Sequence, residues 1–154
     1  MPGFNDILWL ISGTTSIFLT WWVLALGFIG LGLGVRRLLG LTAVNVQRCL
    51  MAFWTGFAVV ILFLQIWNFF FPVQWPALAL VMAAGAIGLA ASRLELTRWL
   101  GGVQWRANLP LIGTSALLVF WVANQAIGGA TQYDSGLYHI QAMEWAATYP
   151  VVPG

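Results

Sequence analysis

Four long runs of apolar residues, almost free of charge, constrain this chain more than any other feature of its sequence. A bilayer core about 30 Å thick needs roughly 20 consecutive apolar residues in a helix. The runs lie at about 7–33, 49–71, 76–91 and 109–129. Across the chain 61% of residues are hydrophobic and 6% are charged, whereas soluble domains carry about 25% charged residues. The sequence therefore predicts an all-α membrane protein with about four transmembrane helices.

The first and third runs depart from the ideal length in opposite directions. The run 7–33 is long for one crossing, so its helix must tilt or continue beyond the hydrocarbon region. It lacks the basic segment before it and the small-residue cleavage site after it that mark a secretory signal peptide. The run 76–91 is short, and we expect its helix to continue through Ser92 and Arg93 for another turn.

The arginines predict the orientation, because short loops rich in Arg or Lys stay on the cytoplasmic side. Two connecting segments, 34–48 and 92–108, contain all six: Arg36, Arg37, Arg48, Arg93, Arg98 and Arg106. The amino-terminal tail, the turn at 71–76 and the carboxy-terminal segment contain none. Both termini are therefore predicted to lie outside the cytoplasm.

Charge and cysteine content argue against several functions. The formal net charge of +2 rests on six basic and four acidic residues, and the arginines do not form the clustered basic surface that nucleic-acid binding requires. No charged residue or histidine lies deep within a run, which argues against a proton pump or a voltage sensor. Cys49 has no second cysteine with which to form a disulfide or a metal site.

Small and amide side chains within the runs are interpreted as packing residues. Two pairs allow close approach of helix backbones where lipid offers no hydrophobic driving force: Gly30 with Gly34, and Ala84 with Gly88. Gln65 and Asn68 lie three residues apart on one face of the second run. Hydrogen bonds between helices are the ordinary use of such amides, and lining a substrate groove is the alternative.

Polar chemistry is concentrated after the fourth run, in residues 131–154. This segment holds two of the four acidic residues and the sole histidine. Asp134 or Ser135 can cap a new helix, and Pro150 ends it. A helix over about 135–149 is therefore predicted in the extracytoplasmic segment.

This helix has a narrow polar stripe and a wide apolar face. At about 100° per residue, Gln141, Glu144 and Thr148 fall within about 40° of Leu137. The wide face predicts an interfacial helix that lies in the membrane surface or against the other helices. His139 belongs to the wide face, so it is expected to be buried against other helices or to point into a pocket.

Two stretches of the segment are distinctive in order and spacing: Tyr133-Asp-Ser-Gly-Leu-Tyr-His-Ile-Gln-Ala-Met-Glu-Trp145 and Tyr149-Pro-Val-Val-Pro-Gly154. They resemble a segment of a large family of bacterial polytopic membrane proteins that look like GT-C glycosyltransferases. In that family the Asp-Ser/Thr-Gly-Leu-Tyr-His run opens an extracytoplasmic helix, and Val-Val-Pro-Gly leads into further loop and spans. The hydrophobic remainder of the chain is similar only in type.

The resemblance implies a transferase that takes a sugar from a polyprenyl-phosphate donor and adds it to a lipid, glycan or protein outside the membrane. Asp134 would be catalytic, as general base toward an acceptor hydroxyl or as organiser of a divalent cation, magnesium or manganese, against the donor phosphate. Asp134 is the only candidate metal ligand. His139 and Glu144 would be further catalytic residues, and Tyr138 would bind substrate.

Each of these residues also has an ordinary structural use. An Asp before a helix is usually an N-cap, a lone His on an apolar face is usually satisfied in the core, and a Glu on a polar stripe is usually solvated. GT-C enzymes have many more spans, so the chain resembles their N-terminal part. Pro153-Gly154 is expected to lead into a longer protein, and the 154 residues alone are expected to be inactive.

An alternative function comes from a different class: a small non-catalytic accessory subunit of a larger membrane complex. The predicted partners are the lipid bilayer, a polyprenyl-phosphate sugar donor for the transferase, and other membrane subunits for the accessory protein. The resemblance places the chain in the bacterial cytoplasmic, or inner, membrane. Residues 1–130 are predicted to form the transmembrane region, and residues 131–154 the start of a larger extracytoplasmic domain.

Protease accessibility tests the predicted orientation. We expect an epitope tag at the carboxy terminus to be cleaved in intact spheroplasts by a protease that cannot cross the membrane, because the basic segments hold the opposite side in the cytoplasm. The matched control is the same tag inserted after Gly40, in an arginine-bearing segment, which should be protected. The reverse pattern would show that the orientation is inverted.

Overall fold

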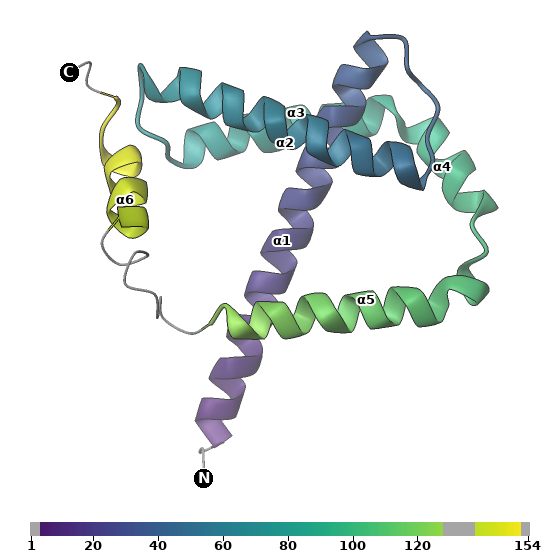
Figure 1. Cartoon of the computed structure of the whole chain (residues 1–154), viewed down its shortest axis with the longest axis horizontal. Helices are drawn as coiled ribbons and strands as arrows, with labels where there is room; N and C mark the ends of the chain where they lie inside the picture. Colours follow the sequence, from purple (N-terminus) through teal and green to yellow (C-terminus); the bar gives the residue numbers. More distant parts are fainter. Residues whose placement is uncertain (1–3, 128–137, 152–154) are drawn as a thin grey trace. The chain divides into compact units, whose positions relative to one another are not determined.

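The computed structural model describes residues 4–127 and 138–151, and within these ranges the regular structure is entirely helical (Figure 1). The helices are α1 (Phe4–Leu38), α2 (Val46–Asn68), α3 (Trp75–Ala91), α4 (Arg93–Gly102), α5 (Trp105–Gln125) and α6 (Ile140–Thr148). Three of them, α1, α2 and α5, are long and apolar enough to cross a membrane, and α3 with α4 form a fourth if the bent pair counts as one span. The predicted all-α class is confirmed for the described residues, with three or four helices that are long and apolar enough to span a membrane.

Helix α1 is the longest, and a glycine-containing turn ends it. Its 35 residues extend about 52 Å, well beyond a hydrocarbon core of about 30 Å. Gly40 adopts a positive φ of 76°, and its N–H donates to the Arg37 carbonyl at 2.9 Å while the N–H of Leu41 donates to the Arg36 carbonyl at 2.9 Å. These two bonds form a Schellman motif, for which glycine is favoured at the left-handed position.

The third helix does not continue beyond Ser92. The chain bends by 65° there, and α4 occupies part of the segment 92–108 that was expected to be a connecting loop. Ser92 is buried and its N–H donates to the carbonyls of Gly88 and Leu89, both at 3.1 Å. A straight continuation of α3 would carry the charged side chains of α4 along the apolar helix, and such charges are costly in lipid. The expectation of another turn through Arg93 is therefore wrong.

Contacts divide the chain into two compact units, and α1 contributes to both. The first unit comprises residues 1–23 and 103–131. In it α1 meets α5 through Phe18 and Phe120, whose rings lie edge to face with centroids 5.8 Å apart. Thr14 and Ala123 are buried in this unit. The Thr14 hydroxyl donates to the Leu10 carbonyl at 2.9 Å, so this buried polar group is satisfied within its own helix.

The second unit comprises residues 24–102 and 132–154, and in it α1 packs directly on the backbone of α3. A Cβ added at Gly30 would collide with the carbonyl of Gly85, and one at Gly88 would collide with the carbonyl of Gly30. Gly34 lies beside the Cα of Gly88. Glycine is required at these positions because any side chain would force the two helices apart.

Another face of α1 makes the same kind of contact with α2. A Cβ at Gly32 would collide with the backbone of Ala52, and one at Gly56 would collide with the carbonyl of Phe28. The ring of Phe28 lies 5.8 Å from that of Phe53, centroid to centroid. The carboxy-terminal half of α1 is thus packed against both helices of the α2–α3 hairpin.

The packing prediction is confirmed for Gly30, Gly34 and Gly88. Ala84, in contrast, is exposed, and the partner of Gly88 on the contact face of α3 is Gly85. The two residues are adjacent in the sequence, so a one-residue change moves the contact by about 100° around the helix. Spacing alone did not distinguish the two faces of this alanine- and glycine-rich helix.

Substitution of Gly30 by Ala tests the contact between α1 and α3. We expect the free energy of unfolding in detergent to fall by about 1–3 kcal/mol, because the new methyl group overpacks a backbone contact. Gly113→Ala is the matched control, since nothing lies within 4 Å of a Cβ at that α5 position, and it should be neutral or stabilise the protein by up to about 1 kcal/mol. Equal thermal midpoints for the two variants would contradict the packing.

Candidate functional site

The residues predicted to carry chemistry belong to α6 and the segment that precedes it. Asp134 lies outside the described residues, as does the predicted cap at Ser135. Tyr138, His139 and Glu144 are described, and all three are exposed. Tyr149 adopts an extended conformation, with φ −128° and ψ 146°, as expected for a residue that precedes proline. Pro150 therefore ends the helix where the sequence predicted.

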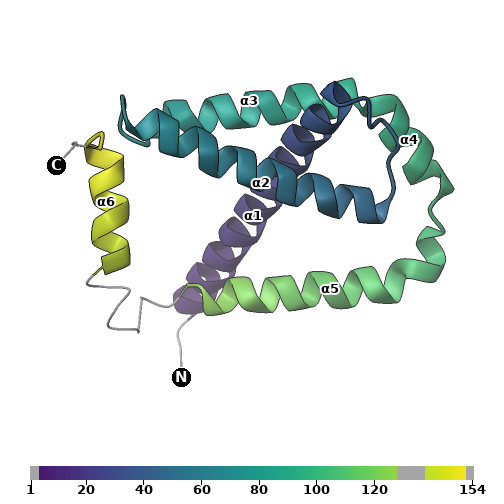
Figure 2. The same cartoon turned by 45° about the horizontal axis from the view of Figure 1, so that its top comes forward.

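The carboxy-terminal end of α6 is hydrogen bonded to the turn between α2 and α3 (Figure 2). The N–H of Val73 donates to the Ala146 carbonyl at 2.7 Å, and the Gln74 side chain donates to the Ala147 carbonyl at 2.8 Å. The last four carbonyls of a helix have no partner within the helix. The turn supplies donors to two of these carbonyls, so α6 is held to the turn through the backbone of its own last turn.

Asn68 completes this junction at the end of α2. Its side-chain amide donates to the carbonyls of Ala146 at 3.4 Å and Tyr149 at 3.3 Å. Its own carbonyl accepts from the N–H of Val151 at 2.7 Å. The sequence predicted that Asn68 would bond to a neighbouring helix. Its side chain bonds to Ala146 of the short helix α6, to Tyr149 just after it, and to Phe71 in the turn that follows α2.

A shallow pocket of about 300 Å³ lies along the polar stripe of α6. It is lined by Gln141, Glu144, Trp145, Thr148 and Tyr149. The predicted grouping of Gln141, Glu144 and Thr148 on one face is confirmed by their shared position in this pocket. The rings of Trp145 and Tyr149 have centroids 4.9 Å apart. Amide, carboxylate and hydroxyl groups beside aromatic rings can hydrogen bond and stack on a polar ligand such as a sugar.

A second, mostly apolar groove of about 580 Å³ lies where α2, the turn and α6 meet. Its lining residues are Ile61, Leu64, Gln65, Asn68, Phe69, Val73, Ala146 and Val151. Gln65 was predicted either to bond between helices or to line a substrate groove; it borders this apolar groove, and its use for a substrate stays a prediction. The groove and the pocket both border α6, so the helix separates an apolar surface from a polar one.

The apolar face of α6 is only partly covered. Tyr138 and Met143 are 67% and 64% exposed, whereas Ala146 and Ala147 are half-buried against the turn. His139 is also exposed, so the alternative in which it is buried against other helices is wrong. The physical reason is that α6 is attached through its last carbonyls, which leaves its first turn clear of α2 and α3.

The described residues do not form a site for a divalent cation. Within 4–127 and 138–151 no group of three His, Cys, Asp or Glu side chains could hold a metal ion. Glu144 supplies a carboxylate, but a hard cation such as Mg²⁺ needs several oxygen ligands. The predicted metal ligand, Asp134, lies outside the described residues, so the divalent cation stays a prediction.

Together, the long apolar helices and the helix tied to one of their turns define a multi-pass α-helical membrane protein. Residues 15–154 match a family described as a domain of unknown function, DUF8201. The chain belongs to that family. No curated protein matches it. No solved structure matches it either.

The sequence did not predict that the side chain of Gln74, in the turn, bonds to the Ala147 carbonyl of α6. Gln74 follows Pro72 in a short turn, and a polar side chain beside the start of an apolar helix would ordinarily be solvated. Its partner is a backbone carbonyl more than 70 residues away in the sequence. The available signal was the shortage of other polar side chains at this end of the two helices, which does not identify the partner.

Asn68→Ala tests the junction between α2 and α6. We expect faster hydrogen exchange of the amides of Tyr149 and Val151, because the variant removes the side-chain bonds from Asn68 to the Ala146 and Tyr149 carbonyls, each worth about 0.5–1.5 kcal/mol. Asn108→Ala is the matched control, since the Asn108 amide donates to the nearby Gln104 carbonyl at 2.9 Å. Unchanged exchange in the Asn68 variant would contradict the junction.

Proposed function

We propose that this chain forms the N-terminal part of a GT-C-like integral membrane glycosyltransferase. The enzyme transfers a sugar from a polyprenyl-phosphate donor to an acceptor on the extracytoplasmic side of the bacterial inner membrane. The resemblance of residues 133–154 to the GT-C-like family motivates the proposal. The attachment of α6 to the α2–α3 turn is the observation that carries it.

This attachment supports the proposal because it places α6 at one end of apolar helices. Arg48 and Asn68 lie near opposite ends of the 23-residue α2, which is about 33 Å long. If the arginine end faces the cytoplasm, the α6 end faces outward, where polyprenyl-linked donors are used. In this orientation both termini are extracytoplasmic and α6 is interfacial, with Met143 and Tyr138 turned toward lipid.

The polar pocket on α6 suits the acceptor or the sugar. Gln141 and Glu144 offer hydrogen-bonding groups to hydroxyls, and Trp145 offers an aromatic face on which a sugar ring can stack. In pockets of this kind, a small number of polar groups fix the orientation of the bound ligand. We propose that Glu144 binds substrate in this pocket, because its exposed carboxylate can accept hydrogen bonds from sugar hydroxyls.

In the proposed reaction Asp134 acts as the general base. The acceptor hydroxyl oxygen attacks the anomeric carbon of the donor sugar, and its proton passes to the Asp134 carboxylate. The bond between that carbon and the donor phosphate oxygen breaks, and polyprenyl phosphate leaves with the electron pair. His139 and Tyr138 lie one turn beyond Asp134 in the sequence, and they are proposed to contact the phosphate or the acceptor.

The second candidate function is the accessory subunit. The most apolar stretch of α5 is 6% buried, compared with 22% for α1. A helix so little covered by its own chain favours docking onto other transmembrane helices. In this reading Asp134 is an N-cap and has no part in chemistry.

Asp134→Asn in the full-length protein distinguishes the two functions. We expect sugar transfer from a radiolabelled polyprenyl-phosphate donor in membranes to fall by about 10²–10⁴-fold, because an amide cannot accept the proton. Asp6→Asn is the matched control, since it removes the other aspartate and should leave transfer unchanged. Size-exclusion profiles and thermal midpoints would show that both variants fold.

Two outcomes would contradict the transferase. Full activity of Asp134→Asn would show that Asp134 is not the general base. Absence of donor turnover by the unmodified protein would show that it is not a transferase. Co-purification with a constant set of membrane subunits, unaffected by Asp134→Asn, would instead support the accessory role.

A further inference from the structure

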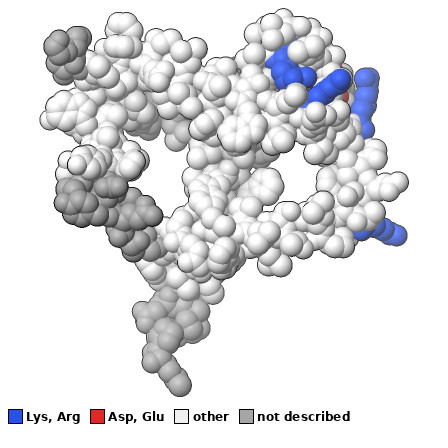
Figure 3. Space-filling model, in the orientation of Figure 1, with Lys and Arg blue, Asp and Glu red and all other residues white. Residues whose placement is uncertain are grey.

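Arginines gather at the end of the second unit that is opposite α6. Figure 3 shows their side chains grouped over the end of α1 and over α4. We use the term arginine patch for Arg36, Arg37, Arg48 and Arg98, which come from three helices. These residues are brought together by contacts around Glu95 and around the start of α2.

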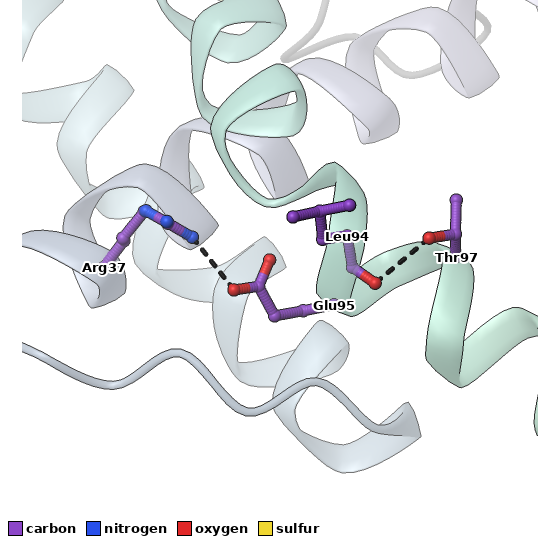
Figure 4. Close-up of polar contacts among 4 residues, drawn as sticks. All are labelled: Arg37, Leu94, Glu95 and Thr97. Atoms are coloured by element: carbon purple, nitrogen blue, oxygen red, sulfur yellow. Dashed lines mark hydrogen bonds and ion pairs between the residues drawn. The ribbon is translucent and has the colours of Figure 1, made fainter.

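Glu95 joins the end of α1 to α4 (Figure 4). The Arg37 Nη1 atom lies 3.2 Å from the Glu95 Oε1 atom. A hydrogen bond from its own backbone amide, the contact with Arg37 and the charge of Arg98 hold the pKa of the Glu95 carboxyl below its usual value. Glu95 is therefore ionised at neutral pH, and its one negative charge is shared between two arginines.

The start of α2 adds positive charge, and among the described residues no ion pair is formed by Arg48. The Asn45 side chain accepts a hydrogen bond from the N–H of Arg48 at 2.8 Å and caps the helix. The first turn of α2 has no acidic residue, although a helix amino terminus favours negative charge. Among the described residues the buried Nε of Arg36 has no hydrogen-bond partner.

The patch thus carries four guanidinium groups against one carboxylate. An exposed apolar surface begins beside it: Leu50, two residues after Arg48 in the direction of the apolar part of α2, is 59% exposed. A ligand that satisfies both features has an anionic group and an apolar chain. Free phosphate satisfies only the first, and an acidic peptide has no reason to lie along apolar helices.

We propose that the arginine patch binds the phosphate headgroup of an anionic phospholipid, whose acyl chains lie along the exposed apolar surface of α2 that begins at Leu50. Arginine suits this role because its planar fork of donors matches phosphate oxygens. Basic pockets at the ends of transmembrane helices bind anionic lipids in this way. The site is independent of the glycosyltransferase, because it lies at the other end of α2 and uses none of the same residues.

Lipid binding to the purified full-length protein tests the site. Native mass spectrometry in neutral detergent would measure the Kd for dioctanoyl phosphatidylglycerol, with dioctanoyl phosphatidylcholine and inorganic phosphate as separate arms. We expect the protein to prefer phosphatidylglycerol over both. Arg48→Gln with Arg98→Gln should weaken binding of phosphatidylglycerol by about fivefold per arginine, or roughly 30-fold for the pair.

The matched control compares single variants: Arg106→Gln removes one charge from the start of α5 and should leave the Kd unchanged, whereas Arg98→Gln alone should weaken binding about fivefold. Equal weakening by the two single variants would overturn the proposal, because only net charge would then matter. Equal binding of the two lipids, or binding of inorganic phosphate as tight as that of phosphatidylglycerol, would also overturn it.

Salt dependence keeps the proposal falsifiable if the patch variant does not fold. For the unmodified protein, raising the salt from about 0.1 M to about 1 M shortens the Debye length from about 10 Å to about 3 Å. We expect the preference for phosphatidylglycerol over phosphatidylcholine to fall accordingly. A preference that does not change with salt would show that the arginines do not hold the headgroup.

Discussion

Direct contact between helix backbones is the interaction on which the second unit depends. In lipid, apolar side chains gain nothing by leaving an equally apolar solvent, so association relies on close van der Waals packing. Gly30 and Gly32 meet this requirement on two faces of α1, against Gly85 of α3 and Ala52 of α2. Because both contacts are made by the same stretch of α1, one helix determines how the α2–α3 hairpin is held together.

The α2–α3 hairpin separates two kinds of chemistry. At one end the turn uses Asn68, Val73 and Gln74 to satisfy carbonyls of α6. At the other end the arginine patch surrounds Glu95 and the start of α2. About 33 Å of apolar helix lies between them, so neither polar group has to enter the hydrocarbon. The bend at Ser92 serves the same purpose, since it turns the charged α4 away from the axis of α3.

The proposed enzyme would use α6 as a fixed support rather than as a mobile anchor. A helix held by backbone hydrogen bonds at its last turn keeps the orientation of its polar stripe, and catalytic or binding groups need such support to act. The anionic-lipid site would stabilise the other end of the same helices. The two proposals are thus linked by α2, although each depends on different residues.

The apolar runs alone determined that the chain is helical and crosses a membrane several times, because the hydrocarbon core demands long helices whatever their partners. Pro150, the polar stripe of α6 and the pair Gly30 and Gly34 were likewise predicted from the sequence, since each depends on local geometry. Only the tertiary structure decided that Gly85 rather than Ala84 faces α1, that α3 breaks at Ser92, and that α6 is bonded to Gln74. These outcomes depend on which surfaces meet, and partners far apart in the sequence leave no periodic or local signal of that choice.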